Sequence, residues 1–494
     1  MTAENTAKIS ELVSMNAEDT AAAQLNKPYR IGTLQYTKIG VVSLFLWLLL
    51  GSFCFTLMEC VVPYILPLKL KSLNASNMFM GLVLTTIPAI FNASVCPAVS
   101  FYSDRYRSRL GRRIPFILLS TPFITLFLVL IGYSQEISKF LLEHVFSGVT
   151  FWSITGGTLF LLAVFVVGFQ FFNMFVSSVY YYLFNDVVPE QFLSRFMSLF
   201  RIVGTGAGAF FNFVIFKYAE TYIKEIFLWA AVLYFIAFML MCFKIKEGDY
   251  PPPPANIGNK TGLLAGISTF CVECFSSRYY WYIFLASASF GLAGSIPFGI
   301  FYYKSLGFTL EQVGKISGLS SLAIVILLYP AGMLCDRYHP VRAMLAAAVF
   351  MAAATSLNFI FLFCEFSTTI NYVLIIAITL VNAPALALCY AAELPMFMKL
   401  LPKAKYGQFG SAGALIRSLG VILGGLLSGV VMDWLTSIYK GSMFCYRYVP
   451  VWVFLCFVPW IIFLLLVYRG WKNHGGDENY VPPETEAARS VCQG

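Results

Sequence analysis

The sequence predicts an all-α polytopic membrane protein with twelve transmembrane helices arranged as two six-helix repeats. Composition, long apolar stretches and an internal repeat all point to this class. Hydrophobic residues make up 59% of the 494 residues, charged residues only 12%, and the mean hydropathy is +0.76. In soluble proteins, hydrophobic residues make up about 45–50% and charged residues about 25%. A soluble fold cannot bury so much apolar surface, so the solvent for most of the chain must be the bilayer.

Twelve stretches are long enough to cross the hydrocarbon core, which takes about 20 apolar residues. They lack the alternation of period two that marks a transmembrane barrel. The first stretch is too long for the apolar region of a signal peptide, so we keep it in the mature chain. The predicted spans are 39–66, 78–101, 114–133, 157–183, 196–217, 225–243, 280–303, 311–333, 343–364, 371–393, 408–432 and 449–468.

The charges predict the orientation. Most of the 33 Lys and Arg residues lie in the two tails and in the connections on the same side as the tails. Such residues favour the cytoplasmic side, so both termini are expected there, in a multi-pass protein of the plasma or inner membrane. The net charge of +9 then reflects topology and lipid contact, and no nucleic-acid partner is expected.

The polar stretch after the sixth span divides the chain. Four prolines, Pro251 to Pro254, make it extended, and an amphipathic pattern follows that predicts a short interfacial helix. The predicted units are a cytoplasmic tail (1–38), an N-terminal six-helix bundle (39–243), a cytoplasmic linker (244–279), a C-terminal six-helix bundle (280–468) and a second tail (469–494).

The two bundles repeat the same pattern. Glycine begins spans two and eight and aspartate ends them, at Gly81 and Asp104 and again at Gly314 and Asp336. Spans five and eleven contain "FRIVGTGAG" and "IRSLGVILGG". Parallel repeats around a central axis are typical of secondary transporters, which bind the substrate between them. The three histidines lie in loops or a tail, so neither an enzyme nor a metal site is expected.

Two loops carry a family resemblance. "SDRYRSRLGRR" and "CDRYHPVR" resemble the signature loop of the major facilitator superfamily, although Ser100 stands where the second copy has glycine. The longer first copy, Pro63–Tyr64, and "GQFGSAG" followed by Asp433 resemble the glycoside–pentoside–hexuronide cation symporters and the sucrose:proton symporters. The resemblance implies the major facilitator fold and alternating access.

The signature loops predict a cytoplasmic gate as well as a topological anchor. Helix N-termini attract anions. We therefore expect Asp104 to contact the start of span eleven and Asp336 the start of span five, and these contacts to break when the halves rock apart. The predicted gate comprises Asp104, Arg105, Arg109, Arg112, Arg113, Asp186, Arg195, Asp336, Arg337, Arg342 and Glu393.

Glu59 is the only carboxylate well inside an apolar stretch of the first half. A charged acid there costs about 2.5–3.5 kcal/mol, so a functional role is the default hypothesis. We predict proton coupling; the alternative is a solvated or arginine-paired glutamate near the outer mouth. Span two lacks the paired aspartates of the sodium-coupled members of the resembled group. The expected coupling ion is therefore a proton rather than sodium, with no other cofactor.

Polar groups inside the spans predict the substrate site. The arginines of spans five and eleven either snorkel to water or face the cavity, where they would neutralise a carboxylate or a substrate anion such as a hexuronide. Each amide either binds substrate or joins helices. The candidate substrate-binding residues are Asn92, Gln170, Asn173, Tyr180, Arg201, Asn212, Tyr302, Asn382, Tyr390 and Arg417.

These observations together predict a monomeric transporter, held in the lipid bilayer, that imports a small sugar or glycoside with a proton. A disaccharide such as sucrose or maltose fits best. The alternatives are a uniporter or exporter of another amphiphile, such as a drug or lysolipid, and a sodium-coupled sugar symporter.

Overall fold

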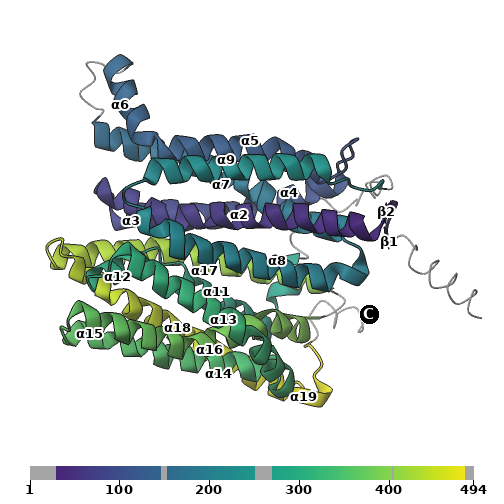
Figure 1. Cartoon of the computed structure of the whole chain (residues 1–494). Helices are drawn as coiled ribbons and strands as arrows, with labels where there is room; N and C mark the ends of the chain where they lie inside the picture. Colours follow the sequence, from purple (N-terminus) through teal and green to yellow (C-terminus); the bar gives the residue numbers. More distant parts are fainter. Residues whose placement is uncertain (1–28, 146–152, 251–269, 403–404, 484–494) are drawn as a thin grey trace, which may run out of the picture.

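The protein is described by a computed structural model that covers residues 29–145, 153–250, 270–402 and 405–483. Within these residues, eleven helices are long and apolar enough to cross a membrane, and one bent helix pair makes a twelfth. Figure 1 shows the long helices running side by side, with the first half of the chain stacked on the second. The predicted fold class is thereby confirmed.

The N-terminal half begins with a hairpin of two short antiparallel strands, which the sequence did not predict. An amphipathic helix, α6, between the third and fourth spans was also not predicted. The elements are β1 (Tyr29–Ile31), β2 (Leu34–Tyr36), α2 (Lys38–Ser72), α3 (Asn77–Gly81), the π-helix η1 (Leu82–Thr86), α4 (Ile87–Arg105), α5 (Ile114–Gly132), α6 (Ser134–His144), α7 (Ile154–Val187), α8 (Glu190–Phe210), the π-helix η2 (Phe211–Ile215), the 3₁₀ helix η3 (Phe216–Tyr218) and α9 (Ile223–Lys244).

The C-terminal half follows the linker, of which the structure describes residues 270–275 as helical. The rest of the predicted interfacial helix lies outside the described residues. The elements of this half are α11 (Arg278–Gly294), α12 (Gly299–Ser305), α13 (Leu310–Tyr338), α14 (Pro340–Ser356), η4 (Leu357–Phe359), α15 (Ile360–Phe363), α16 (Thr368–Leu400), α17 (Tyr406–Ile438), η6 (Met443–Tyr448), α18 (Val449–Asn473) and α19 (Gly476–Asn479).

Hydroxyl side chains fix where several of these helices begin. Thr37, Ser153 and Ser367 each accept a hydrogen bond from a backbone N–H in the first turn of α2, α7 and α16. Thr309 and Gln312 form a reciprocal capping box at the start of α13. Each cap satisfies a backbone donor that the helix itself leaves unpaired.

The seventh span is not one helix. The predicted span over 280–303 is a bent helix pair, in which α11 and α12 meet at a break with a bend of 45°. Gly294, Pro297 and Gly299 surround the break. Glycine lowers the cost of leaving helical geometry, and proline removes a backbone donor and clashes with the preceding turn.

The two halves meet at one end of the bundle. We call the end where α2 begins and α18 ends the tail side, and the other end the seam side. At the seam side α3 and η1 pack on α17, and η2 and η3 pack on α13. Gly81 and Gly314, the repeat-related glycines, lie in these contacts: an added Cβ would be 2.2 Å from the Gly425 oxygen and 2.1 Å from the Asn212 oxygen, respectively. The halves therefore touch backbone to backbone there.

Candidate functional site

A cavity of about 380 Å³ lies between the halves at the bend of the seventh span. We call it the central cavity; α2, η1, the α11–α12 bend and α13 line it. None of its lining residues, all in the described part of the chain, is charged. Its polar groups are hydroxyls, and two of these are phenolic. They belong to Tyr64, Thr85, Ser295, Tyr303 and Ser317. Such a lining suits a neutral ligand that can both stack and form hydrogen bonds.

Glu59 of α2 has a specific partner. The Asn173 side-chain nitrogen of α7 donates to its Oε1 atom over 2.7 Å. Asn173 is 4% exposed, whereas Glu59 is exposed. Tyr181 lies within electrostatic reach of both Glu59 and Arg201. The predicted coupling acid and two predicted substrate residues thus belong to one region of the N-terminal half.

The face of α7 predicted to bind substrate instead packs on α2. Tyr180 is fully buried, and its hydroxyl donates to the Leu48 carbonyl oxygen over 2.6 Å. Asn173 and Tyr180 share this face because they are seven residues apart, close to two helical turns. Gln170, one turn earlier, is half-buried. The structure therefore does not bring Tyr180 to the central cavity.

The two repeat-related arginines differ in their surroundings. Arg417 forms an ion pair with Glu393 of α16 and lies over the Phe290 ring, 5.7 Å from its centroid. Arg201 is exposed and has no hydrogen bond or ion pair with any described residue. Asp186 of α7, a predicted gate residue, pairs with the loop arginines Arg112 and Arg113. The C-terminal arginine is neutralised within its own half, and the N-terminal one is not.

The other candidate substrate residues lie at different depths. Asn92 is exposed on α4, and Tyr390 is exposed on α16, within electrostatic reach of Tyr64. Asn212 is buried in η2 beside Tyr64, and its side-chain oxygen has no hydrogen-bond partner in the described part of the chain. Tyr302 and Asn382 line a separate cavity within the C-terminal half.

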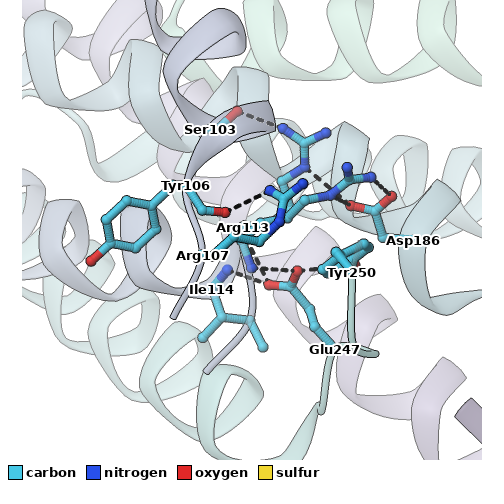
Figure 2. A network of polar contacts seen from close by, with 9 residues as sticks. Ser103, Tyr106, Arg107, Arg113, Ile114, Asp186, Glu247 and Tyr250 are labelled. Atoms are coloured by element: carbon cyan, nitrogen blue, oxygen red, sulfur yellow. Dashed lines mark hydrogen bonds and ion pairs between the residues drawn. The ribbon is translucent and has the colours of Figure 1, made fainter. Parts of the chain in front are cut away.

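The first signature loop forms a network on the tail side, drawn in Figure 2. Arg112 donates to Asp186 of α7 over 2.9 and 2.5 Å, and Arg113 donates over 3.1 Å. The Glu247 carboxylate accepts from the backbone N–H groups of Arg112, Arg113 and Ile114 at 2.9, 2.8 and 2.6 Å. Glu247 thereby caps α5. The sequence prediction missed it, although an acid directly after a span is a possible cap signal.

The contacts predicted between the signature aspartates and the opposite half are not formed by the described side chains. Asp336 is exposed and has no hydrogen bond or ion pair among them. The side chain of Asp104 lies outside the described residues. Arg342 pairs with Asp477 over 2.7 Å, within its own half. The reason is the position of the contact between halves, which lies on the seam side. The remaining gate residues, which are all exposed, are Arg105, Arg109, Arg195 and Arg337.

A polar contact between the halves, not predicted from the sequence, lies on the seam side. Asp433 of α17 accepts hydrogen bonds from the Asn77 backbone and side-chain nitrogens at 2.7 and 2.9 Å and from the Met78 backbone at 2.8 Å. Tyr446 donates to the Asn77 side-chain oxygen over 2.6 Å and accepts from Lys71 over 2.8 Å. A carboxylate of one half thus caps the first helix segment of a span in the other. Asp433 was noted in the sequence only through the family resemblance.

Two bundles that meet at one end, with a cavity between them, are the arrangement typical of membrane transporters built from two repeats. The comparisons agree. The family described as the Major Facilitator Superfamily matches residues 48–425 and 283–490. The chain belongs to this superfamily, whose members are transporters rather than enzymes and bind small-molecule substrates in a lipid membrane.

Solved structures share the fold at low sequence identity. A bacterial homologue of the human lysosomal transporter Spinster, in an inward-facing and occupied conformation, is similar with a TM-score of 0.63 and 13% identity over 90% of this chain and 99% of that one. A D-xylose–proton symporter is similar with a TM-score of 0.60 and 13% identity, over 90% of this chain and 99% of that one. The nucleoside transporter NupG (D323A mutant) is similar with a TM-score of 0.60 and 15% identity, over 86% of this chain and 100% of that one. A search of curated proteins found no match.

Proposed function

We propose that this transporter imports a sugar or glycoside, with a disaccharide as the best-fitting substrate, by proton-coupled symport through alternating access. The central cavity carries the proposal. Its polar lining consists of hydroxyls and includes two tyrosine rings, and it holds no charged side chain. A sugar ring offers hydroxyls at its edge and apolar C–H faces, which match such a lining. The D-xylose–proton symporter and the nucleoside transporter among the similar structures have sugar-containing substrates in their names.

Glu59 is the proposed proton-coupling group. It lies inside the α2 span and is exposed, and the buried Asn173 amide holds it from one side. An acid at this depth is costly unless it has a function or a partner. The neutral amide of Asn173 can hydrogen-bond to the carboxylate and, after rotation, to the carboxylic acid. The pair therefore tolerates both protonation states, as a coupling site must.

The proposed orientation places the tail side in the cytoplasm of a plasma or inner membrane, following the excess of Lys and Arg on that side. The seam side would then face outward. With the halves joined at the seam side, the present conformation corresponds to the inward-facing state of the proposed cycle.

The proposal is tested by sugar-evoked current from proteoliposomes on a solid-supported membrane, in sodium-free buffer with equal pH on both sides. The panel is glucose, sucrose, maltose, lactose, melibiose and a glucuronide. We expect a sustained charge movement with one sugar, abolished in Glu59→Gln and retained in Glu190→Gln, which changes an exposed carboxylate at the start of α8. Counterflow of labelled sugar without current would support sugar transport and refute proton coupling. Absence of both would refute sugar transport.

A second candidate, transport of another amphiphile, is favoured by one observation. An apolar groove of about 530 Å³ runs between α2, η2, η3 and α9. Aromatic and aliphatic side chains line it, with Glu225 as its one charged residue. A lysolipid that displaced a fluorescent lipid from the purified protein, combined with silence of the sugar panel, would establish this candidate in place of the first.

A further inference from the structure

A second cavity lies wholly within the C-terminal half. This cavity, which we call the side chamber, has a volume of about 320 Å³ and lies among α12, α13, α14, η4, α16 and α18. It shares three lining residues with the central cavity: Ile296, Gly299 and Tyr303. The two spaces therefore adjoin at the α11–α12 bend, where the seventh span is interrupted.

The side chamber contains more polar groups than its own contacts satisfy. The Tyr302 hydroxyl donates to the Asn358 side-chain oxygen over 2.8 Å, and the Asn358 nitrogen donates to the Thr355 carbonyl oxygen over 3.0 Å. The Asn382 side-chain oxygen is buried and has no hydrogen-bond partner among the described residues. An acceptor left in this condition costs about 1–3 kcal/mol. A ligand donor is one way to satisfy it.

Three hydroxyls add to this demand. Ser320, Thr355 and Thr379 line the side chamber, and their side chains make no hydrogen bond with any described residue. They come from α13, α14 and α16, so unpaired polar groups reach the chamber from three different helices. Convergence of this kind is typical of a ligand pocket lined mainly by apolar groups with a few directed polar ones.

The rest of the lining favours a neutral ring. Ile375, Ile378 and Leu386 supply apolar surface, and no lining residue, each within the described part of the chain, carries a charge. Small-molecule pockets generally span about 300–1,000 Å³. Each of the two cavities lies near the lower limit, so each suits one ring, and a two-ring ligand would use both.

We propose that the side chamber is the subsite for the second ring of a disaccharide or glycoside whose first ring occupies the central cavity. This inference rests on the proposed function. The link between the rings passes the α11–α12 bend, where Gly299 has no side chain and an added Cβ would meet nothing within 4 Å. A hydroxyl of the second ring donates to Asn382, and others bond to the hydroxyls of Thr355 and Thr379.

The test compares a disaccharide with its own monosaccharides. Binding of maltose and glucose, or of whichever disaccharide and component the wild type transports, is measured by counterflow competition in proteoliposomes. We expect the wild type to bind the disaccharide at least tenfold more tightly. In Thr355→Leu, which fills the chamber from α14, this preference is lost while monosaccharide binding is unchanged. Ala353→Leu introduces the same leucine side chain on the exposed side of α14 and is the control.

Variants of nearly equal side-chain volume test the contribution of the polar groups separately from that of volume. Thr355→Val and Asn382→Leu, which keep approximate side-chain volume, are each expected to weaken disaccharide binding severalfold and to leave monosaccharide binding unchanged. Wild-type disaccharide preference in Thr355→Leu, or an equal loss of both ligands in the folded variant, would overturn the side-chamber assignment alone. A wild type that binds no sugar in the panel would overturn the proposed function, and this inference with it.

Discussion

The seam-side contact at Asp433 sets how firmly the halves are closed there. Its carboxylate accepts three hydrogen bonds from Asn77 and Met78, all across the two halves. Asp433→Asn keeps the shape, removes the charge and turns one acceptor into a donor that faces an N–H group. The loss is about one hydrogen bond to a charged group, worth about 1.5–3 kcal/mol. Since about 1.4 kcal/mol is a factor of ten, separation of the seam becomes about ten- to 150-fold more favourable.

Hydrogen exchange read by mass spectrometry measures this change. Backbone amides at the start of α3 and in the last turns of α17 exchange only when their contacts open, so their rates follow the opening equilibrium. In Asp433→Asn we expect faster exchange in peptides that cover 74–86 and 428–440, by one to two orders of magnitude, and unchanged exchange in α5 and α14.

The control is Asp477→Asn, which removes a tail-side carboxylate whose only described ion pair is with Arg342 in the same half. Exchange at the seam should remain at the wild-type rate in this variant. If the Asp433→Asn rates stay within twofold of wild type, the carboxylate does not hold the halves together and the reasoning fails.

Three further outcomes are expected. Glu247→Gln should lower the free energy of unfolding by about 1.5–3 kcal/mol and lower the melting temperature. Glu143→Gln, which removes an exposed ion pair within one helix, should lower it by less than about 0.5 kcal/mol. Gly314→Ala places a Cβ 2.1 Å from a backbone oxygen of η2, so seam exchange should rise; Gly332→Ala, with nothing within 4 Å, should leave it unchanged. Burial, aided by the positive charge of Lys399, lowers the pKa of His339 to about 4. Unfolded histidine has a pKa of about 6.5, so the unfolded chain binds the proton first and stability falls as the pH drops from about 6.5 to about 4. The melting temperature at pH 5 relative to pH 7 should therefore decrease less in His339→Asn.

Composition and apolar length were enough to predict the fold class, because the bilayer imposes span length and forces backbone hydrogen bonds inside helices. The bend in the seventh span was missed, although Gly294, Pro297 and Gly299 mark it, because an apolar count does not register local backbone preference. The hairpin before α2 was missed for a similar reason. It is too short to show a pattern, and a contact with Phe192 of α8 holds its Tyr29 ring.

The site was harder to predict because partners come from distant helices. Glu59 and Asn173 were each proposed as functional from residue type, but their hydrogen bond joins positions 114 residues apart. Helical spacing placed Asn173 and Tyr180 on one face correctly, yet it could not show that this face meets α2. Hydroxyls such as those of Thr355 and Ser320 are common in transmembrane helices, where they often bond to their own backbone. Only the structure distinguishes the unpaired ones.

The two halves repeat the same sequence pattern, but their equivalent residues do not all have the same surroundings. Gly81 and Gly314 keep equivalent places at the seam, so the repeat predicts where the halves touch. The repeat-related arginines do not behave alike: Arg417 is neutralised by Glu393, and Arg201 has no ion pair among the described residues. Both cavities that suit a neutral ligand are lined without charge and lie at or within the C-terminal half. Glu59 and Arg201, which form no ion pair with any described residue, belong to the N-terminal half. Under the proposed function, the N-terminal half carries the coupling acid Glu59, and both halves line the central cavity. Exchanging substrate specificity should accordingly require changes around Tyr64 and Thr85 as well as in α12 to α16, with Glu59 left in place.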